Sequence, residues 1–417
     1  MQIYKFGGAS VKDVDGVKNL ALLLDKLEAK NTVIVVSAMG KTTNALEKVV
    51  HNYFNDKDAL SASIQKNEEF HHTIASQLFP TGHLVFKKIQ DLFLELKGFI
   101  ARNKSPQYDF VYDQIVCYGE LLSTTIISLY LNEINLTNTW LDARELIKTD
   151  SRNRDAQVIW DKTQENIKKA FTKNTRYIIQ GFIASNQHNF TTTLGREGSD
   201  YTGAIVAYCL GANSLTIWKD VPGILNGDPK VFENTQLLHQ VSYEEAIELA
   251  FYGASVIHPK TLQPLQRKEI PLFVKSFISP KEKGTSVSKG QRLVPEVPCY
   301  ILKKNQVLLS LSSIDFSFMM EDNISELFQL LGEYKMKVDL IQNSAISFSV
   351  CVDNRFDTLE LLLKQLKPKF KVQLHEGVSL YTIRHFTDKV LRSFEKDKTV
   401  LLKQVTQNTV QFVTLPD

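Results

Sequence analysis

The chain has 417 residues, 43% of them hydrophobic and 23% charged, which is the composition of a soluble globular protein with two or three domains. Its 49 basic and 46 acidic side chains leave a net charge of +3 and give no reason to expect nucleic acid as the main partner. Composition therefore excludes a dedicated nucleic-acid binder and favours an ordinary globular protein.

The cysteines and the N-terminus bear on the compartment. Four cysteines lie far apart and show neither a disulfide framework nor metal-ligand spacing: Cys117, Cys209, Cys299 and Cys351. The chain opens without a signal-peptide pattern, and no uninterrupted apolar stretch approaches the roughly 18 residues that span a bilayer. We therefore expect a cytoplasmic protein that contacts no membrane.

The first predicted unit is a strand at 2–6, a glycine turn at 7–10 and a helix whose apolar positions run from Val14 to Leu27. Lys5 lies at the end of the strand. The turn lacks the Gly-Lys-Ser/Thr ending of a Walker loop. Its N–H groups are still able to cradle phosphate, with Lys5 as a point charge.

A fully apolar strand, Thr32–Val36, leads into a second strand-to-helix loop at 37–44, on the same sheet edge as Lys5. Residues 58–102 are predicted to form long helices. Val116–Leu131 follows as an apolar helix with Glu120 near its start. An acid at that position either complements the helix dipole or binds a substrate ammonium group.

The stretch 191–203 carries the most chemistry, because it combines hydroxyls, two glycines, an arginine and two acids. It lies between a predicted strand, Tyr177–Ile183, and an apolar helix. Ligands of open α/β sheets bind where strands end and helices begin, and a helix N-terminus favours anions. Arg196 suits a carboxylate or phosphate. The alternative is a surface turn whose helix is capped by Ser199 or Asp200.

Further strands are predicted at 214–218 and 271–274, with helices at 243–252 and after 259. The loop at 219–230 is rich in Gly, Pro and Asp, as a plain surface loop would also be. Strands and helices thus alternate from 2 to about 276, and the strands are mostly apolar. This alternation predicts an α/β domain with a mostly parallel sheet covered by helices on both faces.

The composition changes at 279–298, where Lys, Gly, Ser and Pro dominate and periodicity is lost. We predict a domain at 1–280, a linker at 281–300 and a second region at 301–417. Residues 307–374 follow the strand-helix-strand-strand-helix-strand order of a split βαβ motif. A shorter copy at 378–413 lacks the last helix and strand, unless the two copies are interleaved.

Three segments together resemble the signatures of aspartate kinases: Lys5–Ser10, Thr192–Thr202 and Trp218–Pro229. Cys117–Ser123 and Gly253–Pro259 also match, and the two C-terminal copies resemble paired ACT regulatory domains. The resemblance covers essentially the whole chain. It implies a three-layer α/β/α amino acid kinase fold followed by α+β, ferredoxin-like ACT domains, the second one abbreviated.

The resemblance implies that ATP and L-aspartate give ADP and 4-phospho-L-aspartate, the first step of lysine, threonine and methionine biosynthesis. An aspartate side chain has a reference pKa of about 3.9, so it is already an ionised nucleophile and needs no general base. The enzyme must position two anions and neutralise charge on the transferring phosphoryl group. Mg²⁺ would bridge the ATP phosphates rather than occupy a protein cage.

The resemblance also implies roles for residues. Lys5 would contact the transferred phosphoryl group, and Asp200 would organise Lys5. Arg196 would clamp the substrate α-carboxylate, Glu120 would pair with its ammonium group, and polar contacts would come from Ser37, Thr43 and Ser199. The nucleotide is expected to bind Lys5, Gly7, Gly8, Ser10, Lys219, Asp220, Leu225, Asp228 and Lys230. An effector, lysine or threonine, is expected near Asn323, Val338, Asp339, Asn343 and Ser344.

Some residues depart from the family pattern. Glu197 stands where glycine is usual, beside Arg196, and would either pair with that arginine or point to solvent. Replacements around the nucleotide loop make its contacts less defined than those of Lys5: Lys219, Leu225, Lys230 and Ser255. In the effector region, Asn323-Ile324-Ser325 replaces a usual Gly-Phe-Leu.

Two alternatives stay open. One is a related kinase that acts on another amino acid, which the combination of Arg196, Glu120 and ACT domains disfavours because it suits a free α-amino acid. The other is a catalytically weak or inactive amino-acid sensor, which Lys5 and Asp200 oppose. Because ACT domains commonly pair and exposed sheet edges need covering, we expect a homodimer through these domains.

Overall fold

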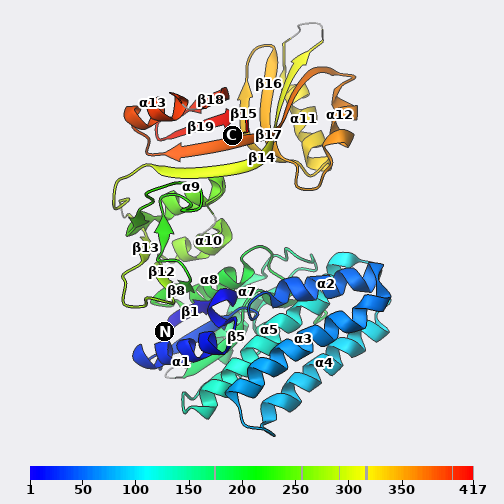
Figure 1. Cartoon of the computed structure of the whole chain (residues 1–417), viewed down its shortest axis with the longest axis vertical. Coiled ribbons are helices and arrows are strands. Elements are labelled where there is room, and N and C mark those ends of the chain that lie inside the picture. Colours follow the sequence, from blue (N-terminus) through cyan, green and yellow to red (C-terminus); the bar gives the residue numbers. More distant parts are fainter. Residues whose placement is uncertain (173–174, 255–256, 291, 315–317, 397, 417) are drawn as a thin grey trace. The chain divides into compact units, whose positions relative to one another are not determined.

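The computed structural model describes residues 1–172, 175–254, 257–290, 292–314, 318–396 and 398–416 (Figure 1). The chain divides into two compact units. The first unit comprises Met1–Ile224, Leu237–Ile247 and Val256–Val294. The second unit comprises Leu225–Gln236, Glu248–Ser255 and Pro295–Asp417.

The first unit contains an eight-stranded sheet in the order β11-β13-β12-β8-β1-β2-β5-β3. The strands β8, β1, β2 and β5 are adjacent and parallel, and β12 and β13 pair in antiparallel fashion. The predicted α/β class is therefore confirmed. The bounds are β1 Gln2–Phe6, β2 Thr32–Val36, β3 Thr139–Leu141, β5 Arg176–Gln180, β8 Ser214–Lys219, β11 Gln240–Ser242, β12 Leu272–Ser276 and β13 Thr285–Ser288.

Helices lie close to the predicted positions 14–27, 58–102 and 243–252 and after 259, but the helix predicted to begin at Val116 begins at Tyr108. The helices of this unit are α1 Val14–Lys26, α2 Thr42–Asn55, α3 Lys57–Leu78, α4 Leu84–Arg102, α5 Tyr108–Glu133, α6 Ala143–Leu146, α7 Trp160–Ala170, α8 Gly198–Leu210, α9 Tyr243–Tyr252, which runs on into the second unit, and α10 Pro259–Arg267, with a 3₁₀ turn, η1, at Gly8–Val11. Among the described helices α5 alone is long and apolar enough to cross a membrane, which the sequence had not led us to expect. Because 78% of its most apolar 18-residue stretch is buried inside the protein, α5 also fits the core helix of a globular protein.

The alternation of β1 decides where Lys5 points. Tyr4 and Phe6 join one hydrophobic core with residues of α1 to α5. Successive side chains of a strand point to opposite faces, so Lys5 lies on the other face. There α8 packs, and a Cβ built on Gly203 would lie 3.8 Å from that of Lys5. The close approach of α8 thus covers the stem of Lys5.

The predicted strand Tyr177–Ile183 is wrong in its second half. The strand β5 ends at Gln180, and β6, Ile183–Asn186, joins a separate sheet with β4, Lys148–Thr149, and β7, Thr191–Thr193. A Cβ at Gly181 would lie 2.4 Å from that of Ser199. Only glycine therefore allows this turn to pass so close to the N-terminus of α8. The apolar run at 177–183 does not reveal that the chain turns here.

The segment at 279–298, predicted to be a linker, contributes β13 to the main sheet. The Thr285 hydroxyl donates to the Leu238 carbonyl at 2.6 Å and accepts from the Ile224 amide at 2.8 Å. This strand has four residues, of which Thr285 and Val287 are buried. It is too short to show in a composition dominated by lysine and serine.

The second unit contains a six-stranded sheet in the order β15-β16-β14-β17-β19-β18, and all its strand pairs are antiparallel. The predicted order of strands and helices is confirmed for the first copy. The bounds are β14 Cys299–Ser313, α11 Glu321–Glu333, β15 Lys337–Asn343, β16 Ser347–Asp353, α12 Leu359–Leu366, β17 Phe370–Arg384, α13 Asp388–Lys396, β18 Val400–Val405 and β19 Thr409–Thr414.

Two long strands join the two copies into one sheet. The second half of β14 pairs with the first half of β17, as Leu309 with Leu374, within the first copy. The first half of β14 pairs with the second half of β17, as Ile301 with Thr382, within the second copy. The copies are therefore interleaved, and the strand at Cys299–Lys303 completes the abbreviated copy, whose one helix among the described residues is α13.

Candidate active site

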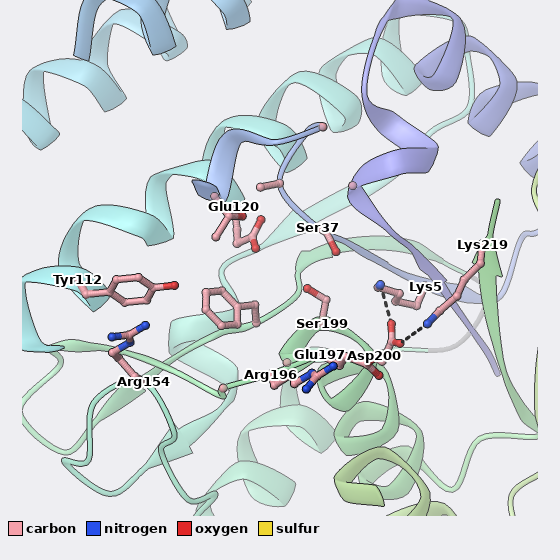
Figure 2. A pocket seen from close by; sticks show the side chains of 17 residues that line it. Lys5, Ser37, Tyr112, Glu120, Arg154, Arg196, Glu197, Ser199, Asp200 and Lys219 are labelled. Atoms are coloured by element: carbon pink, nitrogen blue, oxygen red, sulfur yellow. Dashed lines mark ion pairs between the residues drawn. The ribbon is translucent and has the colours of Figure 1, made fainter. Parts of the chain in front are cut away.

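A cavity of about 520 Å³ opens in the first unit, where four adjacent parallel strands end (Figure 2). Lys5 near the end of β1, Ser37 after β2, Phe182 after β5 and Lys219 at the end of β8 all line it. The structure thus brings together all seven residues predicted for catalysis and substrate binding and two more that were predicted for the nucleotide. The seven are Lys5, Ser37, Thr43, Glu120, Arg196, Ser199 and Asp200, and the two are Gly8 and Lys219.

Backbone hydrogen bonds hold the loops after β1 and β2 together. The Gly40 amide donates to the Gly8 carbonyl at 3.0 Å, and the Ser37 amide donates to the Phe6 carbonyl at 3.1 Å. A Cβ at Gly8 would lie 2.7 Å from the Ala38 carbonyl oxygen. Glycine at position 8 therefore lets the turn after β1 lie flat against the loop after β2.

Three charges meet at one end of the cavity, two of them buried and that of Lys219 half-buried. Lys5 Nζ lies 2.6 Å from Asp200 Oδ1, and Lys219 Nζ lies 3.4 Å from Asp200 Oδ2 (Figure 2). Burial raises the pKa of Asp200, but the positive charges of Lys5 and Lys219 outweigh it and hold that pKa below the ordinary value. The carboxylate is therefore ionised and fixes both ammonium groups at the cavity wall.

The N-terminus of α8 adds to this positive end. Asp200 lies in its first turn, and Glu197 precedes it with a left-handed φ of 53°. The helix dipole favours an anion at this position. Glu197 works against this dipole, since its carboxylate faces the same cavity and burial raises its pKa, although Lys219 lowers it. It is half-buried rather than pointing to solvent, and the Oε2 atom has no hydrogen-bond partner in the described part of the chain.

Glu120 is a buried acid without a full set of partners. Its side chain is 3% exposed, and burial raises its pKa to about 8, although Lys5 and a hydrogen bond from the Ala38 amide lower it. Among the described residues no group pairs with its Oε2 atom. Since α5 begins at Tyr108, Glu120 lies in the middle of the helix, so complementing the helix dipole does not explain it. A cationic ligand would complete the site.

The sequence did not point to three other residues of the cavity wall, Tyr112, Arg154 and Phe182. Phe182 was assigned to a strand, but it follows β5 with a φ of 69°. Arg154 lies in a charged loop without any motif, and its φ is 62°. The charge density of residues 150–155 is the only signal in the sequence that points to this loop.

Several residues predicted for the nucleotide do not line the cavity. Ser10 is buried, and its hydroxyl donates to the Trp218 carbonyl at 3.4 Å. Gly7 and Asp220 lie close to the cavity in the chain but outside its wall. The remaining ones, Leu225, Asp228 and Lys230, belong to the second unit, and Ser255 lies outside the described residues. Their roles stay predictions.

The residues predicted for an effector gather around β15 and α11. Val338, Asp339 and Asn343 lie on β15, Ser344 follows it, and Asn323 accepts a hydrogen bond from the Met320 amide at 3.1 Å. The Asp339 carboxylate is buried and pairs with Lys303 at 2.8 Å and with Lys337 at 3.3 Å. An effector at this carboxylate would have to compete with these two lysines.

The comparisons with known proteins agree with this geometry. The model of the amino acid kinase family matches residues 1–276. The chain is 31% identical to the lysine-sensitive aspartokinase 3 of Escherichia coli K12, over 91% of this chain and 86% of that protein. It is 32% identical to the chloroplastic aspartokinase 1 of Arabidopsis thaliana, over 87% of this chain but 65% of the plant protein.

A solved structure extends the similarity to the whole fold. The crystal structure of E. coli aspartokinase III in complex with aspartate and ADP matches with a TM-score of 0.84 at 27% identity. That match covers 100% of this chain and 96% of the E. coli chain. The chain therefore belongs to the amino acid kinase family, within its aspartokinase branch.

Proposed function

We propose that this protein is an aspartate kinase that transfers the γ-phosphoryl group of ATP to the side-chain carboxylate of L-aspartate. The observation that carries the proposal is one cavity with two complementary ends. Lys5, Lys219 and the start of α8 form an end for phosphate, and the incompletely paired Glu120 forms an end for an ammonium group. The E. coli relative, whose structure contains aspartate and ADP, supports the same substrates.

At the phosphate end the residues act by position and charge. Lys5 offers its ammonium group to the phosphoryl oxygens, whose charge spreads in the transition state. Asp200 holds the Lys5 ammonium group in place, because the two groups are 2.6 Å apart in a buried site. The incoming carboxylate is ionised at neutral pH, so no residue has to remove a proton from it.

At the amino-acid end the residues select a free α-amino acid. Glu120 receives the ammonium group, which replaces the missing partner of Oε2 and favours its ionised form. Arg196 receives the α-carboxylate, and Ser37, Thr43 and Ser199 supply polar contacts. Because these groups surround the substrate, its reacting carboxylate is directed toward Lys5.

Mg²⁺ would enter with ATP. Among the described residues no three His, Cys, Asp or Glu side chains gather as a metal cage, and Asp200 already pairs with two lysines. The site therefore fits an ion held mainly by the phosphates, where it would neutralise part of their charge.

We further propose regulation by an amino acid, lysine or threonine, through the second unit. The E. coli relative is described as lysine-sensitive, and residues of the predicted effector region surround β15. This strand is an edge of its sheet, which supports a homodimer through a second copy of the edge. The buried cysteines fit a cytoplasmic enzyme of amino-acid biosynthesis.

Trapping the acyl phosphate tests the proposal. Purified protein is incubated with ATP, Mg²⁺ and one candidate acid, either aspartate, glutamate or N-acetylglutamate, and hydroxylamine converts any acyl phosphate to a hydroxamate. We expect hydroxamate from aspartate and none from the other acids. Hydroxamate from glutamate alone would point to a different amino acid kinase, and none from any acid would favour a sensor without turnover. Added lysine and threonine test the effector in the same assay.

A further inference from the structure

We propose that Arg154 is a substrate-binding residue, a second guanidinium that holds the carboxylate of the amino acid that is not phosphorylated. The proposal rests on the proposed function, since it names a further contact in the same cavity. It adds a residue that neither a motif nor the arrangement of strand ends identifies.

Arg154 lies at the end of the cavity opposite the two lysines. Arg154 and Tyr112 line the cavity on the side of Glu120 that faces away from Lys5 and Lys219 (Figure 2). The substrate presents its reacting carboxylate to Lys5 and its ammonium group to Glu120. Its remaining carboxylate therefore extends toward the end where Arg154 lies. A guanidinium matches a carboxylate in shape and charge.

A buried acid holds the backbone of Arg154. Asp113 is fully buried and accepts hydrogen bonds from the Arg154 amide at 3.1 Å and from Asn153 Nδ2 at 2.8 Å. The same carboxylate accepts from the Thr193 hydroxyl at 2.7 Å and from its amide at 3.2 Å. One buried acid thus ties the Arg154 loop to the strand that leads into Arg196 and Asp200.

The left-handed backbone of Arg154 supports a role beyond folding. A φ of 62° is unfavourable for a side chain with a Cβ, and such conformations persist where the surroundings enforce them, often at functional sites. Phe182 and Glu197, which line the same cavity, also have positive φ. The strain is therefore shared by three segments of one wall.

The Arg154 guanidinium is held in orientation by an aromatic ring. It lies 4.3 Å from the centroid of the Tyr112 ring, which sets its plane. Its acidic neighbours are loosely placed, since Glu47 lies 3.6 Å away and Asp109 3.4 Å away, and the side chain is 42% exposed. Arginine has five N–H donors, and the bond to Asp109 is its one side-chain hydrogen bond within the described residues. The group is oriented and still has donors for a ligand.

A purely structural role is the competing explanation. Arg154 would then only connect α2 and α5 through Glu47 and Asp109. Removing it would disturb the whole cavity and affect all substrates alike. A substrate-binding role predicts an effect that depends on the carboxylate itself, and this difference decides the experiment.

The test compares aspartate with L-isoasparagine, which keeps the β-carboxylate and the ammonium group but has an amide in place of the α-carboxylate. We expect Arg154→Ala to raise the KM for aspartate about tenfold, the loss expected for one charge-assisted contact, with kcat within about twofold. The KM for isoasparagine should stay within about twofold. Arg154→Lys should be intermediate, because it keeps the charge and loses the fork.

Two sets of variants control the interpretation. Arg152→Ala removes an exposed arginine of the same loop, paired with Asp150 at 2.6 Å, and should leave both KM values unchanged. Tyr112→Phe keeps the ring and should be neutral, whereas Tyr112→Leu should reproduce part of the Arg154→Ala effect.

Two outcomes would overturn the proposal: an unchanged KM for aspartate in Arg154→Ala, or an equal change for both substrates. If the unmodified enzyme turns over neither substrate, the proposed function fails. Calorimetric titration of aspartate and isoasparagine into the unmodified protein and Arg154→Ala then still shows whether Arg154 contacts the α-carboxylate.

Discussion

The two ends of the cavity hold their charges in different ways. At one end Lys5 and Asp200 are 2.6 Å apart, and their side chains are 9% and 2% exposed. At the other end Arg154 lies more than 3 Å from its acidic neighbours, and its side chain is 42% exposed. Close, buried pairing fixes a charge in place, whereas loose, exposed pairing lets a ligand take over a partner.

Because of this difference, we expect substitutions at the two ends of the cavity to have different kinetic effects. Charges that meet the phosphoryl group must be positioned before the reaction, so removing one lowers kcat. Charges that hold the amino acid act in the ground state and the transition state alike, so removing one raises KM. The predictions below test that division.

The largest effect is expected at Lys5. Lys5→Ala should lower kcat by about 10³-fold or more, because it removes the ammonium group at the phosphoryl oxygens. Lys5→Met keeps most of the side-chain volume and should lose as much activity, which separates charge from packing. Lys12→Ala, a change at an exposed lysine, serves as the control. Turnover of either Lys5 variant within tenfold of the unmodified enzyme would refute the assignment.

The next effect is expected at Glu120. Glu120→Gln keeps the shape but removes the charge that receives the substrate ammonium group. We expect the KM for aspartate to rise about 100-fold, since a buried charge-assisted contact is lost, with a much smaller change in kcat. Initial rates at varied aspartate measure both values. A fall in kcat with an unchanged KM would contradict the assignment of Glu120 to the amino-acid end of the cavity.

The same residue predicts a pH dependence of binding. The pKa of Glu120 is raised to about 8 in the empty cavity, so at neutral pH the ammonium group binds only after the carboxyl loses its proton. The KM for aspartate should therefore fall as the pH rises toward 8 and then level off. In Glu120→Gln the KM for aspartate should no longer depend on pH in this range. A pH dependence that persists in this variant would mean that another group causes it.

Glu120 also predicts a pH dependence of stability. Its folded pKa, about 8, lies above the ordinary value of 4.5, so its contribution to stability is complete below pH 4.5 and is lost as the pH rises through 8. In urea unfolding, the free energy of unfolding of the unmodified protein should fall relative to that of Glu120→Gln as the pH rises across this window, by at most about 5 kcal/mol. A free energy of unfolding that rises with pH relative to that of Glu120→Gln would contradict the raised pKa.

The smallest effect is expected at Glu197, which lies at the phosphate end but has the wrong charge for it. Glu197→Gly should stabilise the protein by about 1 kcal/mol, since glycine adopts a left-handed φ without strain. It should also lower the KM for ATP about twofold, because Lys219 no longer faces this carboxylate.

Two variants separate strain from charge at Glu197. Glu197→Gln should change only the KM for ATP. Glu28→Gly relieves a similar φ of 46° at an exposed position and should change only stability. A Glu197→Gly protein less stable than the unmodified one would show that the carboxylate, and not the backbone strain, determines the contribution of position 197 to stability.

The parts of the site that could be predicted are those that follow from strand ends. Lys5, Ser37 and Lys219 come at the ends of apolar strands, and parallel pairing brings such ends together. Glu120 carries a charge within an apolar helix, and Asp200 lies in a polar loop between a strand and an apolar helix. Each of these signals is local in the sequence.

The parts that could not be predicted depend on backbone conformation or on long-range pairing. Nothing in the residue type shows that Arg154 and Phe182 adopt a positive φ, because both usually avoid it. The strand β13 has too few residues for a periodic pattern. The 15-residue strand β17 runs from the end of the first predicted copy, at 374, into the start of the second, at 378, because its two neighbouring strands keep it continuous through Gly377.

The most direct test of the division between the two ends is the affinity for aspartate in the absence of ATP. Calorimetric titration at pH 8.5 compares Lys5→Met with Glu120→Gln. We expect Lys5→Met to bind aspartate within about tenfold of the unmodified protein, although it has lost turnover, and Glu120→Gln to bind about 100-fold more weakly. Weak binding by Lys5→Met together with normal binding by Glu120→Gln would contradict the account.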